Sequence, residues 1–447
     1  MSERVPEDRC GYVSAEDLPE DLGGVCCWRS IWKNNNKCFW HTEKESKSCT
    51  ELQNAQLNKG ERLDGAILKK SAIPPISFAD AILWDADFKS STLSNVNFSN
   101  ANICNSSFLG ADLREADLSN TSAVNADFWH CSLRGADLIG ADMSNSRLAN
   151  VDLRDTDTIG LTIEKANLNE ANLKGLMLSN ALMTKSTFAG ANLSDTQMSQ
   201  LYLKGADFEG ATLKNAKASN TNFSQVNFED ASLVQADIRD SNFKNTRFYQ
   251  TLFSDTRINS NTDFGDTTAY EDPDIDLGEN YEDTSRFEAA AWVYRRLQDL
   301  HEENAMSEQA REYHVRKEEA HRSNYWSKGQ YFQWFVYTLN RYLTRHGESL
   351  KHVVTWSVGT ILTCALAYPF AGGISTGNEV FRVGSGAALG GLFLRSLYFS
   401  TVTFTTLGYG DYHPVGPAAK ALAGAESLAG ALLVALFVFV LGRRVAR

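Results

Sequence analysis

The feature that most constrains the fold is a five-residue repeat that occupies residues 61–265. Large apolar residues recur at every fifth position from Leu63 to Ile258, in forty units whose register never slips. A period of five fits neither an α-helix nor a flat strand. It fits a coil with four flat sides, in which the large residue points inward and a small residue two positions earlier fills the corner. The repeat therefore predicts a stack of about ten coils, roughly 48 Å long at the usual strand spacing.

This pattern resembles the pentapeptide-repeat family, and the resemblance implies a right-handed quadrilateral β-solenoid over residues 51–265. The central position departs from large apolar residues at Ala123, Thr158 and Ala218. We expect such a solenoid to be a spacer or a docking surface for an unidentified cytoplasmic partner. Some pentapeptide-repeat proteins are DNA-shaped gyrase inhibitors, but 25 acidic and 18 basic side chains make residues 61–265 a weak phosphate mimic. With a net charge of −12 for the chain, we expect no nucleic-acid partner.

Residues 1–50 form a separate module that holds five of the eight cysteines: Cys10, Cys26, Cys27, Cys38 and Cys49. Cys38 and His41 have the spacing of two ligands to one metal ion. Cys10 and either Cys26 or Cys27 would complete four ligands for a structural zinc ion. The alternative is a reduced-thiol module packed by tryptophans, namely Trp28, Trp32 and Trp40.

The N-terminal sequence has no apolar stretch of the kind that signal peptides carry, so we expect the module to stay in the cytoplasm. Residues 266–283 are an acidic linker, and residues 284–345 have helical periodicity. Ser285 and Glu288 form a capping box, and the first two helices resemble a tetratricopeptide hairpin. The aromatic and basic residues that follow predict an interfacial helix beside a membrane.

Two segments of residues 346–447 are long and apolar enough to cross a membrane: residues 353–370 and 416–442. Basic residues flank both on one side, at Arg341, Arg345, Lys351, Arg443, Arg444 and Arg447. By the positive-inside rule, both chain ends of this region are cytoplasmic. The protein is thus expected to be a multi-pass protein of the cell membrane.

Between the two segments, the short apolar stretch 392–404 leads into the sequence TTLGYGD at residues 405–411. This order resembles the two-transmembrane pore domain of potassium channels, the ion channel family, whose filter is usually Thr-Val-Gly-Tyr-Gly. Here the filter residues are Thr406, Leu407, Gly408, Tyr409 and Gly410, with Leu in place of Val.

The resemblance implies that carbonyl oxygens of residues 406–409 and the Thr406 hydroxyl replace the water shell of a permeating potassium ion. Gly408 and Gly410 would supply backbone with positive φ without a Cβ penalty. Tyr409 would pack against the pore helix, and Asp411 would anchor the outer mouth. Thr405 and Glu426 are further expected to support the filter. One chain forms one wall, so three further copies are required.

The second membrane segment is expected to carry the gate. Gly430 lies 19 residues after Asp411, where the family keeps a hinge glycine; close packing is the alternative role. Helical spacing then predicts that the cavity and gate are lined by Ala431, Val434, Val438 and Gly442. The competing face is Leu433, Phe437 and Val440.

The domain order resembles the pentapeptide-repeat ion channels of prokaryotes. We therefore expect a potassium-selective, tetrameric channel with cytoplasmic N-terminal domains. The alternative is a membrane-anchored solenoid interaction protein whose pore conducts poorly or unselectively. The repeats are uniform, and no His, Ser or carboxylate constellation stands out, so we expect no enzyme activity.

Overall fold

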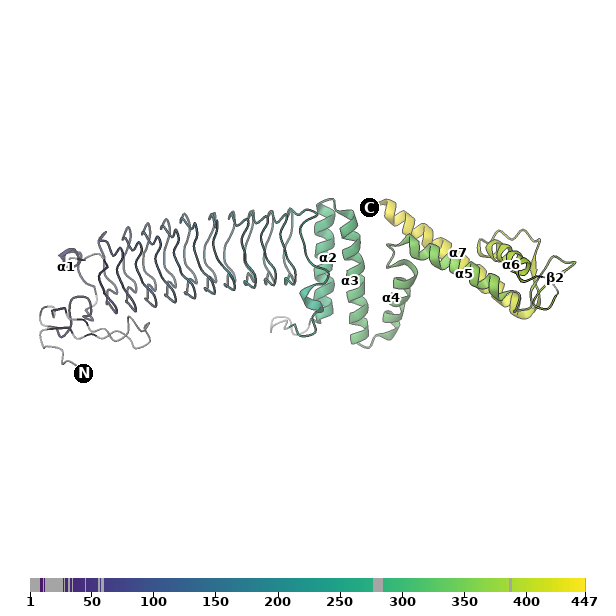
Figure 1. The fold of residues 1–447 in the computed structure, drawn as a ribbon, viewed down its shortest axis with the longest axis horizontal. Helices are drawn as coiled ribbons and strands as arrows, with labels where there is room; N and C mark the ends of the chain where they lie inside the picture. The colour runs from purple at the N-terminus through teal and green to yellow at the C-terminus, as the bar shows by residue number, and fades with distance from the viewer. Residues whose placement is uncertain are drawn as a thin grey trace. The chain divides into compact units, whose positions relative to one another are not determined.

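The computed structural model describes residues 9–10, 12, 27, 29–30, 33, 35–44, 46–54, 57, 60–275, 284–385 and 388–446. The chain divides into two compact units, Met1–Met306 and Ser307–Arg447. In the first unit, a short N-terminal module is followed by the helix α1 (Cys49–Asn54), then by stacked coils, and the unit ends with the helix α2 (Arg286–Glu303) (Figure 1).

Successive coils are joined by parallel bridges between residues 20 apart, such as Thr92 to Asp112. Twenty residues are four five-residue units, so each coil has the four units that the repeat predicts. The inward side chains stack in columns with the same spacing: the rings of Phe88 and Phe108 are parallel, with centroids 4.8 Å apart. The solenoid fold is therefore confirmed, while its handedness stays a prediction.

The three exceptional central residues are also buried: Ala123, Thr158 and Ala218. Thr158 adapts to its inward position because its hydroxyl donates a hydrogen bond to the Met177 carbonyl, 2.8 Å away. A polar group in an apolar core is tolerated when it is paired in this way.

A tight turn ends each unit and sets the period. In one example the Val96 N–H donates to the Leu93 carbonyl (3.1 Å), and Asn95 has a φ of 62°. A turn with positive φ at its third residue favours Gly or Asn, which reach the left-handed region at low cost. This position, two residues after each large apolar residue, is mostly Asn, Asp or Gly throughout the repeat.

The last coil closes with an insertion and a cap. Asn242 pairs with Asp263 instead of residue 262, so one extra residue enters the register after Ile258. Beyond it, the Asn304 side chain donates to the Thr256 carbonyl (2.9 Å) and accepts from the Ile258 N–H (3.2 Å). The residue that follows α2 thus satisfies backbone groups at the end of the stack.

The first part of the expected linker 266–283 is folded onto the solenoid. It contains the short 3-10 helix η1 (Ala269–Glu271), and the Tyr270 side chain is fully buried. Its hydroxyl donates to Glu229 (2.7 Å) and accepts from the Tyr249 N–H (2.9 Å). Burial raises the pKa of Glu229, while Tyr270 and the paired guanidinium of Arg247 oppose that rise.

The capping box of Ser285 and Glu288 is present at the start of α2. The next helix, α3 (Ser307–Ser327), belongs to the second compact unit. The two helices of the expected tetratricopeptide-like hairpin therefore lie in different units.

The second unit contains two helices that are long and apolar enough to cross a membrane, within Leu350–Ala367 and Gly416–Arg444. These are α5 (Leu350–Ala367) and α7 (Gly416–Ala446), and both pack against α6 (Leu389–Phe404) (Figure 1). A small antiparallel sheet of order β2-β1-β3 joins β1 (Ile374–Ser375), β2 (Val380–Phe381) and β3 (His413–Pro414). It ties the segment after residue 411 to the loop after α5.

The helix α4 (Tyr331–Thr344) carries an exposed apolar face made of Tyr331, Phe332, Phe335, Leu339 and Tyr342. Arg341 on its opposite side pairs with Glu319 of α3 (3.1 Å), and Arg345, just after the end of α4, pairs with Glu312 of α3 (3.0 Å). Such a two-faced helix has the composition of an interfacial helix, and its contact with lipid stays a prediction.

Candidate ion-conduction and metal sites

The segment that follows α6 has an alternating backbone. Positive φ angles occur at Thr406 (56°), Gly408 (55°) and Gly410 (74°). The two glycines have the conformation expected of them. Positive φ at Thr406 was not expected, because a β-branched residue rarely adopts it. Such strain persists where the surrounding structure imposes it, and it commonly marks a functional segment.

The residues from Thr405 to Asp411 are all exposed in a single chain, although the helices before and after them in the sequence, α6 and α7, pack against each other. Tyr409 is 68% exposed, so α6 of the same chain leaves its side chain largely uncovered, and its packing against a pore helix stays a prediction. The Thr405 hydroxyl donates back to the Thr401 carbonyl (2.8 Å) and continues the hydrogen bonding of α6. The segment therefore continues directly from α6 at Thr405 and is exposed throughout in a single chain.

Glu426 of α7 is buried and links three helices. Its carboxylate accepts a hydrogen bond from the Tyr368 hydroxyl (2.6 Å), at the end of α5, and another from the Ser400 hydroxyl of α6. A carboxylate in an apolar helix is costly unless it is paired in this way. Tyr368 and Ser400 were not predicted, since they lie 58 and 26 residues away in sequence.

Gly430 sits where α7 crosses the end of α6. A Cβ atom at this position would lie only 2.1 Å from the Phe404 carbonyl oxygen. Close packing alone therefore requires a glycine here, and α7 continues through it without a break. The hinge role stays a prediction.

The two candidate pore-lining faces of α7 differ in burial. The stripe of Ala431, Val434, Val438 and Gly442 is exposed in one chain. On the competing face, Leu433 (7% exposed) and Val440 (1% exposed) pack against Val353 and Phe404. Two residues of the competing face are thus already covered within the chain.

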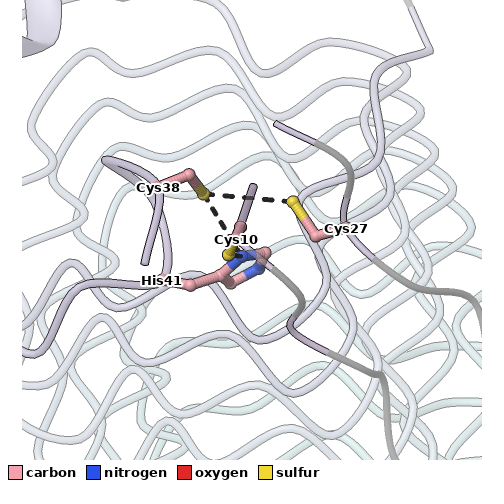
Figure 2. Close-up of side chains that lie close together, drawn as sticks. All are labelled: Cys10, Cys27, Cys38 and His41. Atoms are coloured by element: carbon pink, nitrogen blue, oxygen red, sulfur yellow. Dashed lines mark hydrogen bonds between the residues drawn. The ribbon is translucent and has the colours of Figure 1, made fainter. Parts of the chain in front are cut away.

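The N-terminal module brings four metal-ligand side chains together: Cys10, Cys27, Cys38 and His41 (Figure 2). Their ligand atoms all lie within 4.8 Å of one another. His41 Nδ1 is 3.1 Å from Cys10 Sγ and 3.3 Å from Cys38 Sγ, and the Sγ atoms of Cys27 and Cys38 are 4.0 Å apart. Of the two cysteines left open by the sequence, Cys27 lies in this cluster. Cys26 lies outside the described residues, as do Trp28 and Trp32.

Local structure explains how the four meet. A turn after Cys38 places His41 beside it, because the His41 N–H donates to the Cys38 carbonyl (3.2 Å). Cys10 and Cys27 come from two segments that pair through backbone hydrogen bonds, such as the Cys27 N–H to the Tyr12 carbonyl (2.6 Å). Hydrogen bonding to Cys38 lowers the pKa of Cys27, which favours the thiolate form that metals bind.

Comparison with known families and structures matches both parts of the chain. The model of the family "Ion channel" matches residues 355–447. Two pentapeptide-repeat models match residues 81–158 and several overlapping stretches between 166 and 255. Neither kind of family is enzymatic. No curated protein matches the chain.

Several solved structures of pentapeptide-repeat proteins are similar to part of this chain. HetL, involved in heterocyst differentiation regulation in the cyanobacterium Nostoc, is 22% identical over 49% of this chain and 88% of its own, with a TM-score of 0.22. QnrB1, a plasmid-mediated fluoroquinolone resistance protein, is 18% identical over 48% and 93%, with a TM-score of 0.22. A protein of the Arabidopsis thaliana thylakoid lumen is 27% identical over 25% and 63%, with a TM-score of 0.15.

The family matches agree with the two parts of the structure. The pentapeptide-repeat stretches fall within the stacked coils. The ion-channel match covers most of α5, all of α6, the filter-like segment (residues 405–411) and the described part of α7. The chain is a membrane protein that joins a pentapeptide-repeat solenoid to an ion-channel domain.

Proposed function

We propose that four copies of this chain form a potassium-selective channel, with residues 406–410 as the selectivity filter. The observation that carries this proposal is the backbone of that segment, within a domain of the ion-channel family. Residues with positive φ (Thr406, Gly408 and Gly410) alternate along the segment with residues of negative φ. This alternation allows successive carbonyl groups to point toward one common axis. The exposed side of the segment and of Tyr409 is the surface that neighbouring copies would cover.

In this channel, α6 is the pore helix, and Glu426 supports the filter by holding Ser400 of α6 and Tyr368, which follows α5. Asp411 and Thr405 flank the filter at its outer and inner ends. The positive-inside rule places Arg341, Arg345 and Lys351 before α5, and the arginines that end α7, in the cytoplasm. The solenoid is then cytoplasmic and serves in docking or regulation, with a partner of unassigned identity. The alternative role is a membrane anchor with a poorly conducting pore.

Ion flux separates these two functions. Proteoliposomes that contain the purified protein and are loaded with potassium in a sodium medium are expected to become negative inside, because potassium leaves and sodium does not replace it. A voltage-sensitive dye reports this potential, and protein-free liposomes are the control. A signal equal to that of protein-free liposomes would establish the anchor alternative.

Cysteine substitution tests the face of α7 that lines the pore. Val438→Cys is expected to react with a cytoplasmic thiol reagent and to lose most of its current, only while the channel is open. An apolar ring at this position would close the pore by dewetting. Phe437→Cys is the matched control, because it is one residue away on the same helix, and it is expected to be unaffected. Rapid block at Phe437→Cys with protection of Val438→Cys would assign the competing face.

We also propose that Cys10, Cys27, Cys38 and His41 hold one structural zinc ion. The donor set of three thiols and one imidazole is a standard zinc set. A tetrahedral zinc site with usual bond lengths separates sulfur atoms by about 3.8 Å, and sulfur from nitrogen by about 3.6 Å. The distances of 4.0, 3.3 and 3.1 Å between these atoms lie close to those values.

A further inference from the structure

The first coil of the solenoid has a backbone edge with no coil before it. Inside the stack, each coil accepts hydrogen bonds from the preceding one. The carbonyls of Trp84, Asp87 and Lys89 accept in this way, from Gly65 (2.6 Å), Leu68 (2.7 Å) and Lys70 (2.8 Å) respectively. Without a preceding coil, the equivalent groups of the first coil would be left open, as at any edge strand.

The N-terminal module supplies these partners instead. The equivalent carbonyls, 20 residues earlier, belong to Asp64, Ile67 and Lys69. They accept hydrogen bonds from the His41 imidazole Nε2 (2.6 Å), from the Lys47 ammonium group and from the Ser46 N–H (3.3 Å), in that order.

Each coil also donates a backbone hydrogen bond to the preceding coil, and the module replaces the acceptor of this bond as well. The Asp87 N–H donates to the Ala66 carbonyl (2.8 Å), and its counterpart at Ile67 donates to the Trp40 carbonyl (2.7 Å). The module also covers the core, because the Trp40 ring meets the Phe78 ring edge-on with centroids 6.2 Å apart. Lys47 is buried where its ammonium group bonds the Ile67 carbonyl, and this desolvation lowers the pKa of Lys47 to about 8.

We infer that the described residues between Cys10 and Lys47 form a metal-dependent cap that replaces a missing coil and holds the N-terminal end of the solenoid closed. This inference rests on the zinc site proposed above. His41 links the two roles: its Nδ1 faces the thiols, and its Nε2 bonds the Asp64 carbonyl. A metal on Nδ1 leaves the proton on Nε2, which must then donate to that carbonyl. Repeat stacks require such capping ends.

Hydrogen exchange of the full-length protein, before and after zinc removal, tests the cap. Elemental analysis first establishes the zinc content, expected to be about one per chain. After removal by a chelator, amides of residues 61–80 are expected to exchange at least tenfold faster, with the effect fading along residues 81–120. The matched interior segment, residues 161–180, is expected to be unchanged; there the Asn167 N–H occupies the position of Ile67 and bonds the Ser146 carbonyl.

Lys47→Met separates the cap from the metal. It removes the ammonium bond to the Ile67 carbonyl without touching a zinc ligand, so zinc content should stay the same while residues 61–80 exchange several-fold faster. Lys44→Met is the control, since Lys44 is an exposed residue of the same module that pairs with Glu51 (3.2 Å). If the protein binds zinc but zinc removal leaves hydrogen exchange unchanged, the metal-dependent cap is refuted and the metal site is retained. Protein that binds no zinc overturns the metal site, and the metal-dependent cap with it.

Discussion

In a planar bilayer with potassium on one side and an equal concentration of sodium on the other, current through the purified protein is expected to reverse far from zero, with the potassium side negative. The two glycines and the tyrosine of the proposed filter give carbonyl rings that replace the hydration shell of potassium. A hundredfold preference for potassium corresponds to a reversal potential of about 118 mV under equal concentrations. Reversal near zero would refute selectivity.

Gly410→Asp is expected to move this reversal potential most of the way to zero, while the protein still assembles. Gly410 has a φ of 74°, so any side chain there is strained, and a carboxylate would also disturb the outermost ring. Gly377→Asp is the matched control. Gly377 has a φ of 90°, and a Cβ atom at either glycine meets no atom within 4 Å. Both substitutions carry similar backbone strain, but Gly377 lies in the β1–β2 loop outside the filter.

Leu138→Asp is expected to be the most destabilising single change in the solenoid. Leu138 is fully buried in the narrow core, and an unpaired charge there costs roughly 4 kcal/mol or more. Because each coil contacts its neighbours, the damage should spread locally along the stack. Limited proteolysis is expected to cut the middle of the solenoid, while native mass spectrometry still finds four chains per particle.

Leu182→Asp is the control for this experiment, since Leu182 belongs to the same solenoid but points outward and is 50% exposed. It should keep its resistance to protease. If Leu138→Asp abolishes the tetramer as well, the solenoid is required for assembly, and the independence of the two parts is refuted.

Much of the architecture could be predicted because it depends on local periodicity. The period of five predicts coils of four units, since each unit repeats the same turn and the same inward residue. The Asn, Asp and Gly residues that often stand two positions after the large apolar residue were a further local signal. The structure showed that they have the left-handed conformation of a turn. The capping box at Ser285 and the glycines of the proposed filter are equally local, so short motifs were enough to identify them.

The sequence alone thus determined the solenoid, the two apolar helices and the filter-like segment. Only the tertiary structure decided which groups meet across long stretches of chain. It chose Cys27 for the cluster, buried Tyr270 of the expected linker against Glu229, and paired Glu426 with Ser400 and Tyr368. It also joined β3 to β1, strands of two residues each that leave no sequence pattern. The physical reason is that these contacts depend on the three-dimensional path of the backbone, which brings together residues whose separation follows no local period.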